Sequence, residues 1–181
     1  MGYGLRVTGY GDIVFLLLLA VMFVGCGHQA PQTPSQRKGQ VPQVDSAQLA
    51  LLQLNQQLAE AADRELTTLA QHQDSAFALY EAGTWMHIIS LGDETTPMPQ
   101  PNEEWTVHMR VYDLKMHLLV DSEASYRIGK KELPQAVEEN IGELHHGAQA
   151  RLLAPWYTAF GLRGAGPIPP YENVIIDIEL R

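Results

Sequence analysis

The chain has few groups of residues whose types and spacing could perform chemistry. His145 and His146 are adjacent and follow Glu143, and imidazole and carboxylate groups are common metal ligands. A metal site needs further ligands at regular spacings, and this pair has none nearby, so we expect two solvated histidines in a turn. Ser122 has no evident histidine and aspartate partners, and we therefore do not expect a hydrolytic triad. The sequence predicts no metal and no cofactor.

Cys26 is the only cysteine in the chain and lies just after an apolar run. Residues 13–24 read IVFLLLLAVMFV. This run is shorter than the roughly 20 residues that a membrane-spanning helix needs, but it fits the core of a secretory signal, which is about 7–15 residues long. The sequence Phe-Val-Gly-Cys at 23–26 resembles a lipobox, in which the cysteine is acylated and becomes the new N-terminus. A phenylalanine stands where leucine is usual.

The segment after Cys26 is rich in Gln, Pro, Ser and Gly, and such a stretch buries too little apolar surface to offset its ordering entropy. We therefore expect a lipoprotein signal peptide at 1–25 and a flexible tether at 26–44. The mature protein would lie in a bacterial cell envelope, anchored through the lipid on Cys26 to the periplasmic or outer-membrane face. An uncleaved anchor, or an ordinary signal with an incidental cysteine, remains an alternative.

The length and the net charge of the chain limit the number of domains and the classes of partner. The chain has 181 residues, which suffices for one globular domain with appendages. Its formal net charge is −9, and nucleic-acid binding needs clustered Lys and Arg that this chain lacks. We expect no nucleic-acid partner.

A long helix is predicted immediately after the tether, within residues 45–80. Residues 47–72 contain neither Gly nor Pro, and Asp45 and Ser46 are good N-cap residues. Apolar side chains recur at helical spacings along one face, namely Leu51, Leu54, Leu58, Ala62 and Leu69. This stripe is too narrow to form a core alone. The helix must pack on the following domain or on a second copy in a homodimer through 47–72.

The second half of the chain reads mainly as strands. Residues 84–89 are β-branched and aromatic, 105–119 begin with strict alternation, and 148–154 and 173–180 follow the same pattern. Residues 133–141 form a short helix, and 156–171 form a long loop rich in Gly and Pro. Trp156 and Tyr157 in this loop either form an exposed patch or pack against the sheet. Many strands with one short helix indicate an antiparallel α+β domain.

Residues 159–180 form a long ordered motif, AFGLRGAGPIPP followed by YENVIIDIEL. This motif resembles the C-terminal signature of the FKBP-type peptidyl-prolyl cis-trans isomerases, which runs Ala-Tyr-Gly, a Gly-rich loop, Ile-Pro-Pro and a strand ending Asp-Val-Glu-Leu. Shorter pieces resemble the family in the same order, namely Val107-His108, Asp121-Ser122, Ile128-Gly129 with 133–141, and 147–153. The Leu-Asn-Gln-Gln-Leu at 54–58 is similar to the N-terminal helices of lipid-anchored, gliding-motility-type FKBP-like proteins.

The resemblance covers residues 82–181 and implies a bent antiparallel sheet wrapped around the short helix, with a proline pocket between them. Twisting an X-Pro bond removes amide resonance, whose loss sets a barrier of about 18–20 kcal/mol. A dry apolar pocket favours the less polar twisted amide. By position, the resemblance implies Asp121 and Phe160 as the catalytic residues. It implies substrate contacts from Met109, Val120, Tyr126, Leu133, Pro134, Val137, Ile168 and Ile176.

Several of these positions depart from the family pattern. Phe160 replaces a tyrosine whose hydroxyl donates to the ligand, and Val137 replaces the tryptophan of the pocket floor. Met109, Val120 and Ile176 also replace aromatic residues. Pro134 falls where a backbone N–H is usual, and proline has none, although a register shift of one residue would restore that donor. Two functions therefore remain open. The first is an envelope-tethered prolyl isomerase that assists the folding of exported proteins. The second is an inactive FKBP-like binding or scaffold lipoprotein in a motility or secretion assembly.

Overall fold

The computed structural model describes residues 45–73 and 76–181. The predicted signal peptide at 1–25, the tether at 26–44 and the lipid site at Cys26 lie outside the described residues. Within the described part, none of the helices is both long enough and apolar enough to cross a bilayer.

The described chain begins with helix α2, Ser46–His72. The Asp45 side chain caps it by accepting a hydrogen bond from the Ala47 N–H at 3.3 Å. The helix ends at His72 because Gln73 is extended, so it is shorter than the range 45–80 in which it was predicted. Residues Ala78–Leu79 instead form the short strand β1.

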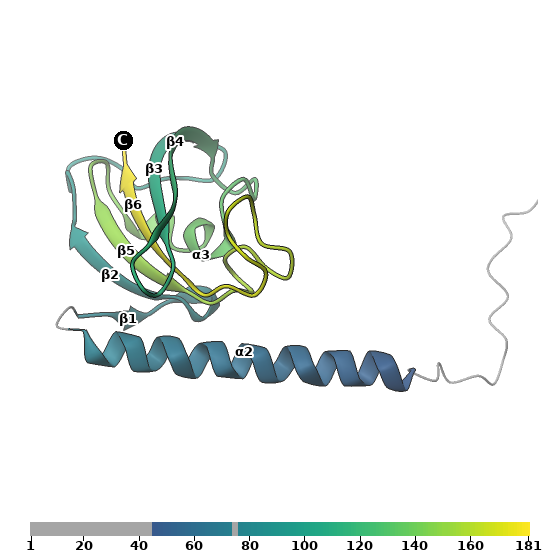
Figure 1. Cartoon of the computed structure of the whole chain (residues 1–181). Helices are drawn as coiled ribbons and strands as arrows, with labels where there is room; N and C mark the ends of the chain where they lie inside the picture. Colours follow the sequence, from purple (N-terminus) through teal and green to yellow (C-terminus); the bar gives the residue numbers. More distant parts are fainter. Residues whose placement is uncertain (1–44, 74–75) are drawn as a thin grey trace, which may run out of the picture. The chain divides into compact units, whose positions relative to one another are not determined.

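Six strands build one antiparallel sheet in the order β1-β2-β5-β6-β3-β4 (Figure 1). After β1 come β2 Trp85–Ser90, β3 Glu104–Tyr112, β4 Leu118–Arg127, β5 Gln149–Ala154 and β6 Val174–Leu180. The sheet bends around the short helix α3, Gln135–Glu138 (Figure 1). Two 3₁₀ turns, Glu81–Gly83 and Ile141–Glu143, complete the described elements. The predicted α+β class, with an N-terminal helix before a bent antiparallel sheet and one short helix, is confirmed.

Two predicted elements have different bounds in the structure. The segment 105–119, which was predicted as strand, is interrupted after Tyr112. There the Asp113 side chain accepts hydrogen bonds from the backbone N–H groups of Lys115 and His117. These bonds form a turn, and β4 begins beyond it at Leu118. The helix predicted at 133–141 is a single turn, because Pro134 can only precede it and a 3₁₀ turn starts at Ile141.

The two faces of the sheet bury different residues. Alternation along the strands sends Leu152 and Ile176 to the inner face, where they pack with α3. Their neighbours Leu153 and Ile175 point to the opposite face, where they pack against the C-terminal half of α2. All the buried residues of α2 are in that half, namely Ala62, Leu66 and Ala70.

Candidate functional site

The predicted pocket residues lie mostly in one cluster between the sheet and α3. Met109, Leu133, Val137, Ile168 and Ile176 are buried in the main core, and Val120, Tyr126 and Phe160 pack against it. Six different elements and loops of the chain contribute to this cluster. The structure therefore brings together the apolar residues that the family resemblance selected.

The centre of this cluster is filled. Val137, at the predicted pocket floor, and Ile176, a predicted substrate contact, are both 0% exposed. Neighbouring side chains therefore cover both residues, and a proline ring cannot touch either of them without a rearrangement. Close packing of this kind is typical of protein interiors.

Asp121 lies away from this cluster. In the antiparallel register of β3 and β4, Val111 faces Val120 and Met109 faces Ser122, while Arg110 faces Asp121. Side chains alternate along a strand, so Asp121 points to the outer face together with Arg110. The pocket position expected for this carboxylate is therefore not observed, because moving a side chain to the other face requires a shift of one residue in register.

On the outer face Asp121 is bonded to His108. The His108 Nε2 lies 2.7 Å from the Asp121 Oδ1, and its Nδ1 lies 3.8 Å from the Glu179 carboxylate. Arg181 donates to Glu179 at 3.0 Å, and this bond is the main cause that lowers the pKa of Glu179 below its usual value. Charged groups thus form a network on the solvent side of the sheet, away from the apolar cluster.

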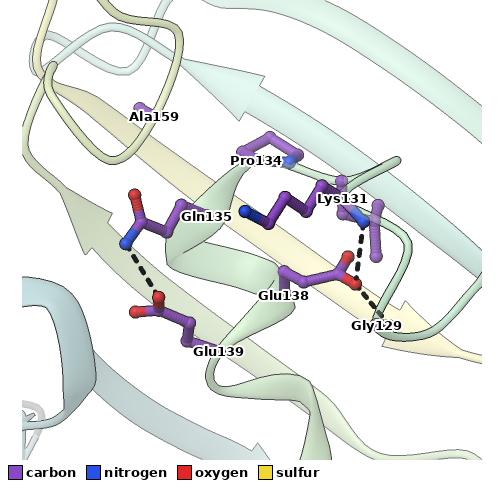
Figure 2. Close-up of a pocket in the computed structure, with 8 residues that line it drawn as sticks. Gly129, Lys131, Pro134, Gln135, Glu138, Glu139 and Ala159 are labelled. Carbon is purple, nitrogen blue, oxygen red and sulfur yellow. Dashed lines mark hydrogen bonds between the residues drawn. The ribbon is translucent and has the colours of Figure 1, made fainter. Parts of the chain in front are cut away.

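A pocket of about 460 Å³ adjoins the cluster at α3 (Figure 2). Leu133, Pro134 and Ala159 provide apolar lining, and two of these are predicted substrate contacts. The rest of the lining is polar or backbone, namely Gly129, Lys131, Gln135, Glu138 and Glu139. A volume of this size is in the range of small-ligand sites, roughly 300–1,000 Å³. It can hold a proline ring and a neighbouring side chain.

Hydrogen bonds fix two sides of this pocket. The Glu138 Oε1 accepts from the backbone N–H of Gly129 at 2.5 Å and of Lys131 at 3.3 Å, so the carboxylate holds the loop before α3 (Figure 2). Gln135 donates to Glu139 at 2.7 Å one turn further along. The second carboxylate oxygen of Glu138 is buried, so this side chain is part of the packed wall of the pocket. The spacing of residues in the sequence could not predict these bonds to Glu138, because its partners are backbone N–H groups.

The loop after β5 carries the opposite wall. The Thr158 carbonyl accepts a hydrogen bond from the Ala136 N–H of α3 at 2.9 Å, and the next residue, Ala159, lines the pocket. Trp156 is only 7% exposed, and its ring lies 4.8 Å from that of Tyr171 at a tilt of 57°. Of the two interpretations of this loop, packing is therefore the correct one for Trp156.

The histidine pair has structural contacts. His145 bonds the Thr96 carbonyl through its Nδ1 at 2.8 Å, and the His146 ring lies 6.0 Å from that of Trp105. Among residues 45–73 and 76–181, His, Cys, Asp and Glu form no group of three or more that could hold a metal ion.

The described residues thus form an α+β domain, in which an antiparallel sheet bends around one short helix and an apolar site lies at the N-terminus of that helix. Residues 96–181 match the family model FKBP_C, FKBP-type peptidyl-prolyl cis-trans isomerase. The match covers the C-terminal part of the chain, where the sequence motifs also resemble this family. A comparison with curated proteins returns no match.

Solved structures share the fold at low sequence identity. The chain is similar to a peptidyl-prolyl cis-trans isomerase from Pseudomonas syringae pv. tomato, with a TM-score of 0.57 and 21% identity over 69% of this chain and 92% of that one. It is similar to AtFKBP13, with a TM-score of 0.51 and 21% identity over 57% and 94% of the two chains. It is also similar to the N-terminal domain of FKBP42 from Arabidopsis thaliana, with a TM-score of 0.51 and 19% identity over 60% and 91%.

Proposed function

We propose that the chain is an envelope-tethered, FKBP-type peptidyl-prolyl isomerase that acts slowly on proline-containing segments of exported proteins. The observation that carries this proposal is the pocket of about 460 Å³ beside Leu133 and Pro134, in a domain of the FKBP-type family. A proline ring would lie against Leu133, Pro134 and Ala159. The polar rim would meet the flanking peptide groups.

The chemistry of the site supports slow rather than fast turnover. Transferring the X-Pro amide to an apolar surface favours the twisted, less polar form, and the pocket lining supplies that surface. Hydrogen-bond donors are scarce, because Pro134 has no N–H and Phe160 has no hydroxyl. Asp121 is bonded to His108 on the other face. The catalytic roles that the resemblance implied for Asp121 and Phe160 stay predictions.

The proposed location rests on the sequence. In this proposal residues 1–25 are removed, the lipid on Cys26 holds the protein on the membrane, and 26–44 tether the domain. Metabolic labelling with a palmitate analogue tests the anchor. Cys26→Ser should lose both the label and membrane sedimentation, whereas a label that persists in this variant would contradict the lipid site.

Exchange NMR on a blocked Ala-Leu-Pro-Phe peptide tests the activity, with the full chain in detergent micelles. Spontaneous cis–trans exchange takes about tens to hundreds of seconds, and we expect the chain to shorten it at least about tenfold. Ala159→Leu should remove the acceleration by filling the pocket. Leu162→Ala, at an exposed position of the same loop, is the control and should retain it. Exchange no faster than in buffer would refute the isomerase.

A second candidate is a binding or scaffold module without turnover in a motility or secretion assembly. The closed packing over Val137 and Ile176 favours it, since the family pocket centre is not open. The same NMR titration separates the two functions. Peptide shifts that saturate and are lost in Ala159→Leu, without faster exchange, would support the module. The absence of both effects would refute both candidates.

We also propose that α2 supports a homodimer. Leu51, Leu52 and Leu54 are 56%, 62% and 50% exposed in its N-terminal half, and residues 46–59 contain no charged side chain that would oppose self-association. Sedimentation equilibrium should give a dimer that Leu51→Ser with Leu54→Ser converts to a monomer. A monomeric wild-type chain would exclude it.

A further inference from the structure

Helix α2 is hydrogen-bonded to the loop that carries one wall of the pocket. Three side chains of α2 each contact this loop after β5: two of them are two residues apart, and the third lies about two turns earlier. The pairs are Asp63 with Tyr157 at 2.5 Å, Glu65 with Asn173 at 2.8 Å, and Asn55 with Tyr171 at 3.3 Å. Helix α2 thus contacts the loop both near the start of the loop and near its end.

One of these contacts leads directly to the pocket. Tyr157 donates to Asp63 of α2, the carbonyl of the next residue, Thr158, accepts from the Ala136 N–H of α3, and Ala159 then lines the pocket. Three consecutive residues of the loop therefore contact α2, α3 and the pocket. The N–H groups of Thr158 and Ala159 both donate to the Pro155 carbonyl, at 3.1 and 3.0 Å. These bonds hold the turn together, so a displacement of Tyr157 is transmitted to the Thr158 carbonyl.

The Tyr157 hydroxyl has little freedom to move. A Cβ atom placed on Gly83 would lie only 2.9 Å from the Tyr157 oxygen, so the 3₁₀ turn Glu81–Gly83 closes one side of it. Burial and the Asp63 carboxylate both raise the pKa of Tyr157 well above its usual value. The hydroxyl therefore remains a protonated donor at all pH values at which the protein would act.

We propose that Asp63 and Tyr157 are positioning residues, through which α2 sets the distance between the Ala159 wall and α3 and thereby the affinity of the pocket. This inference rests on the proposed binding of proline-containing segments at that pocket. It gives α2 a role beyond that of a spacer between the tether and the domain.

The chain offers a matched control for this role. Tyr171 also donates to α2 from the same loop, through Asn55, but it follows Ile168 and is not adjacent to a residue that bonds α3. Tyr157→Phe and Tyr171→Phe each remove one hydroxyl and keep the ring. A general loosening of α2 should affect the two variants alike, whereas positioning through Thr158 should affect Tyr157→Phe alone.

The test uses the full chain in detergent micelles and two readouts. The first is the affinity for the blocked Ala-Leu-Pro-Phe peptide. The second is amide hydrogen exchange over residues 135–139, which needs no ligand. A hydrogen bond to a charged group contributes enough that Tyr157→Phe and Asp63→Ala should each weaken peptide affinity about fivefold and speed this exchange by a similar factor. Tyr171→Phe should change neither by more than about twofold.

The double variant makes the test stricter. Because both substitutions break one bond, Tyr157→Phe with Asp63→Ala should cost no more than either alone. Additive effects, or equal effects of Tyr157→Phe and Tyr171→Phe, would overturn the proposal. If the wild-type chain binds no peptide, the proposed function fails, and hydrogen exchange alone then decides whether α2 positions this wall.

Discussion

Gly164 occupies the tightest position of the loop that presents Ile168 to the core. Its φ of +65° is in the left-handed region, and an added Cβ would lie 2.1 Å from the Ile168 carbonyl oxygen and 2.7 Å from the Pro169 carbonyl carbon. Both neighbours are backbone atoms, which cannot rotate away. We therefore predict that Gly164→Ala forces this part of the loop open.

The cost has two parts. A non-glycine residue in the left-handed region costs about 1–2 kcal/mol. Opening the loop also breaks the two hydrogen bonds between Ala165 and Ile168, at 3.1 and 2.9 Å, which contribute about 1 kcal/mol each. The sum is about 3–4 kcal/mol, equivalent to a fall in melting temperature of roughly 10 °C for a chain of this size.

Gly166 is the matched control, because its φ of +54° is also left-handed but a Cβ there meets nothing within 4 Å. Gly166→Ala should cost only the conformational part, about 1–2 kcal/mol. Urea denaturation of both variants, followed by circular dichroism, measures the difference. Equal losses in the two variants would show that the contact with Ile168 and Pro169 is relieved without breaking the loop, and would refute this reasoning.

Three further predictions concern α2, the β3–β4 turn and the outer face. Leu66→Ala should lower the free energy of unfolding by about 3 kcal/mol because Leu66 is fully buried, whereas Leu52→Ala should change it by less than about 0.5 kcal/mol; equal effects in urea denaturation would mean that α2 is not docked. The bonds from His117 and Lys115 lower the pKa of Asp113, so its stabilising effect is present at neutral pH and is lost as the pH falls through its folded pKa. The difference in urea midpoint between wild type and Asp113→Asn should therefore shrink in acid, and a constant difference would contradict this sign. Asp177→Asn should cost about 2 kcal/mol in thermal unfolding, because Asp177 accepts from Arg151 at 2.6 and 2.8 Å and its loss leaves that guanidinium partly buried without its partner; an unchanged melting temperature would refute it.

The sequence predicted the fold well where a local pattern carries the information. Strand β6 alternates over its whole length, and the signature that includes it reads continuously to the end of the chain. The bounds of the β3–β4 hairpin were not predictable from periodicity, because apolar residues continue at every second position through the turn, at Leu114, Met116 and Leu118. The Asp113 side chain creates that turn through hydrogen bonds to backbone groups, and such bonds leave no hydrophobic signal.

The candidate site was predicted less completely, for a related reason. Family motifs selected side chains that do gather in the core, such as Met109 and Ile168. They could not show on which face Asp121 lies, since one residue more or less in the preceding turn reverses the face of every side chain that follows. They also could not find the contacts of Glu138 and Tyr157, whose partners are a loop backbone and a helix that precedes the matched family segment.

Smaller core residues stand where the family resemblance implies aromatic ones. They account for the closed pocket floor and for the pocket that remains beside it. Where the family has an aromatic floor, Val137 lies fully buried against the sheet, so the reduced volume has been closed by packing rather than left as a void. Closing this space leaves Leu133 and Pro134 at the edge of the cluster, where they line the pocket with Ala159. The width of that pocket then depends on the loop that carries Ala159, and this loop is bonded to α2 through Tyr157. In the proposed function, a helix outside the sheet therefore determines how the site fits a proline-containing chain, because Asp63 of α2 holds Tyr157 in the loop that carries Ala159.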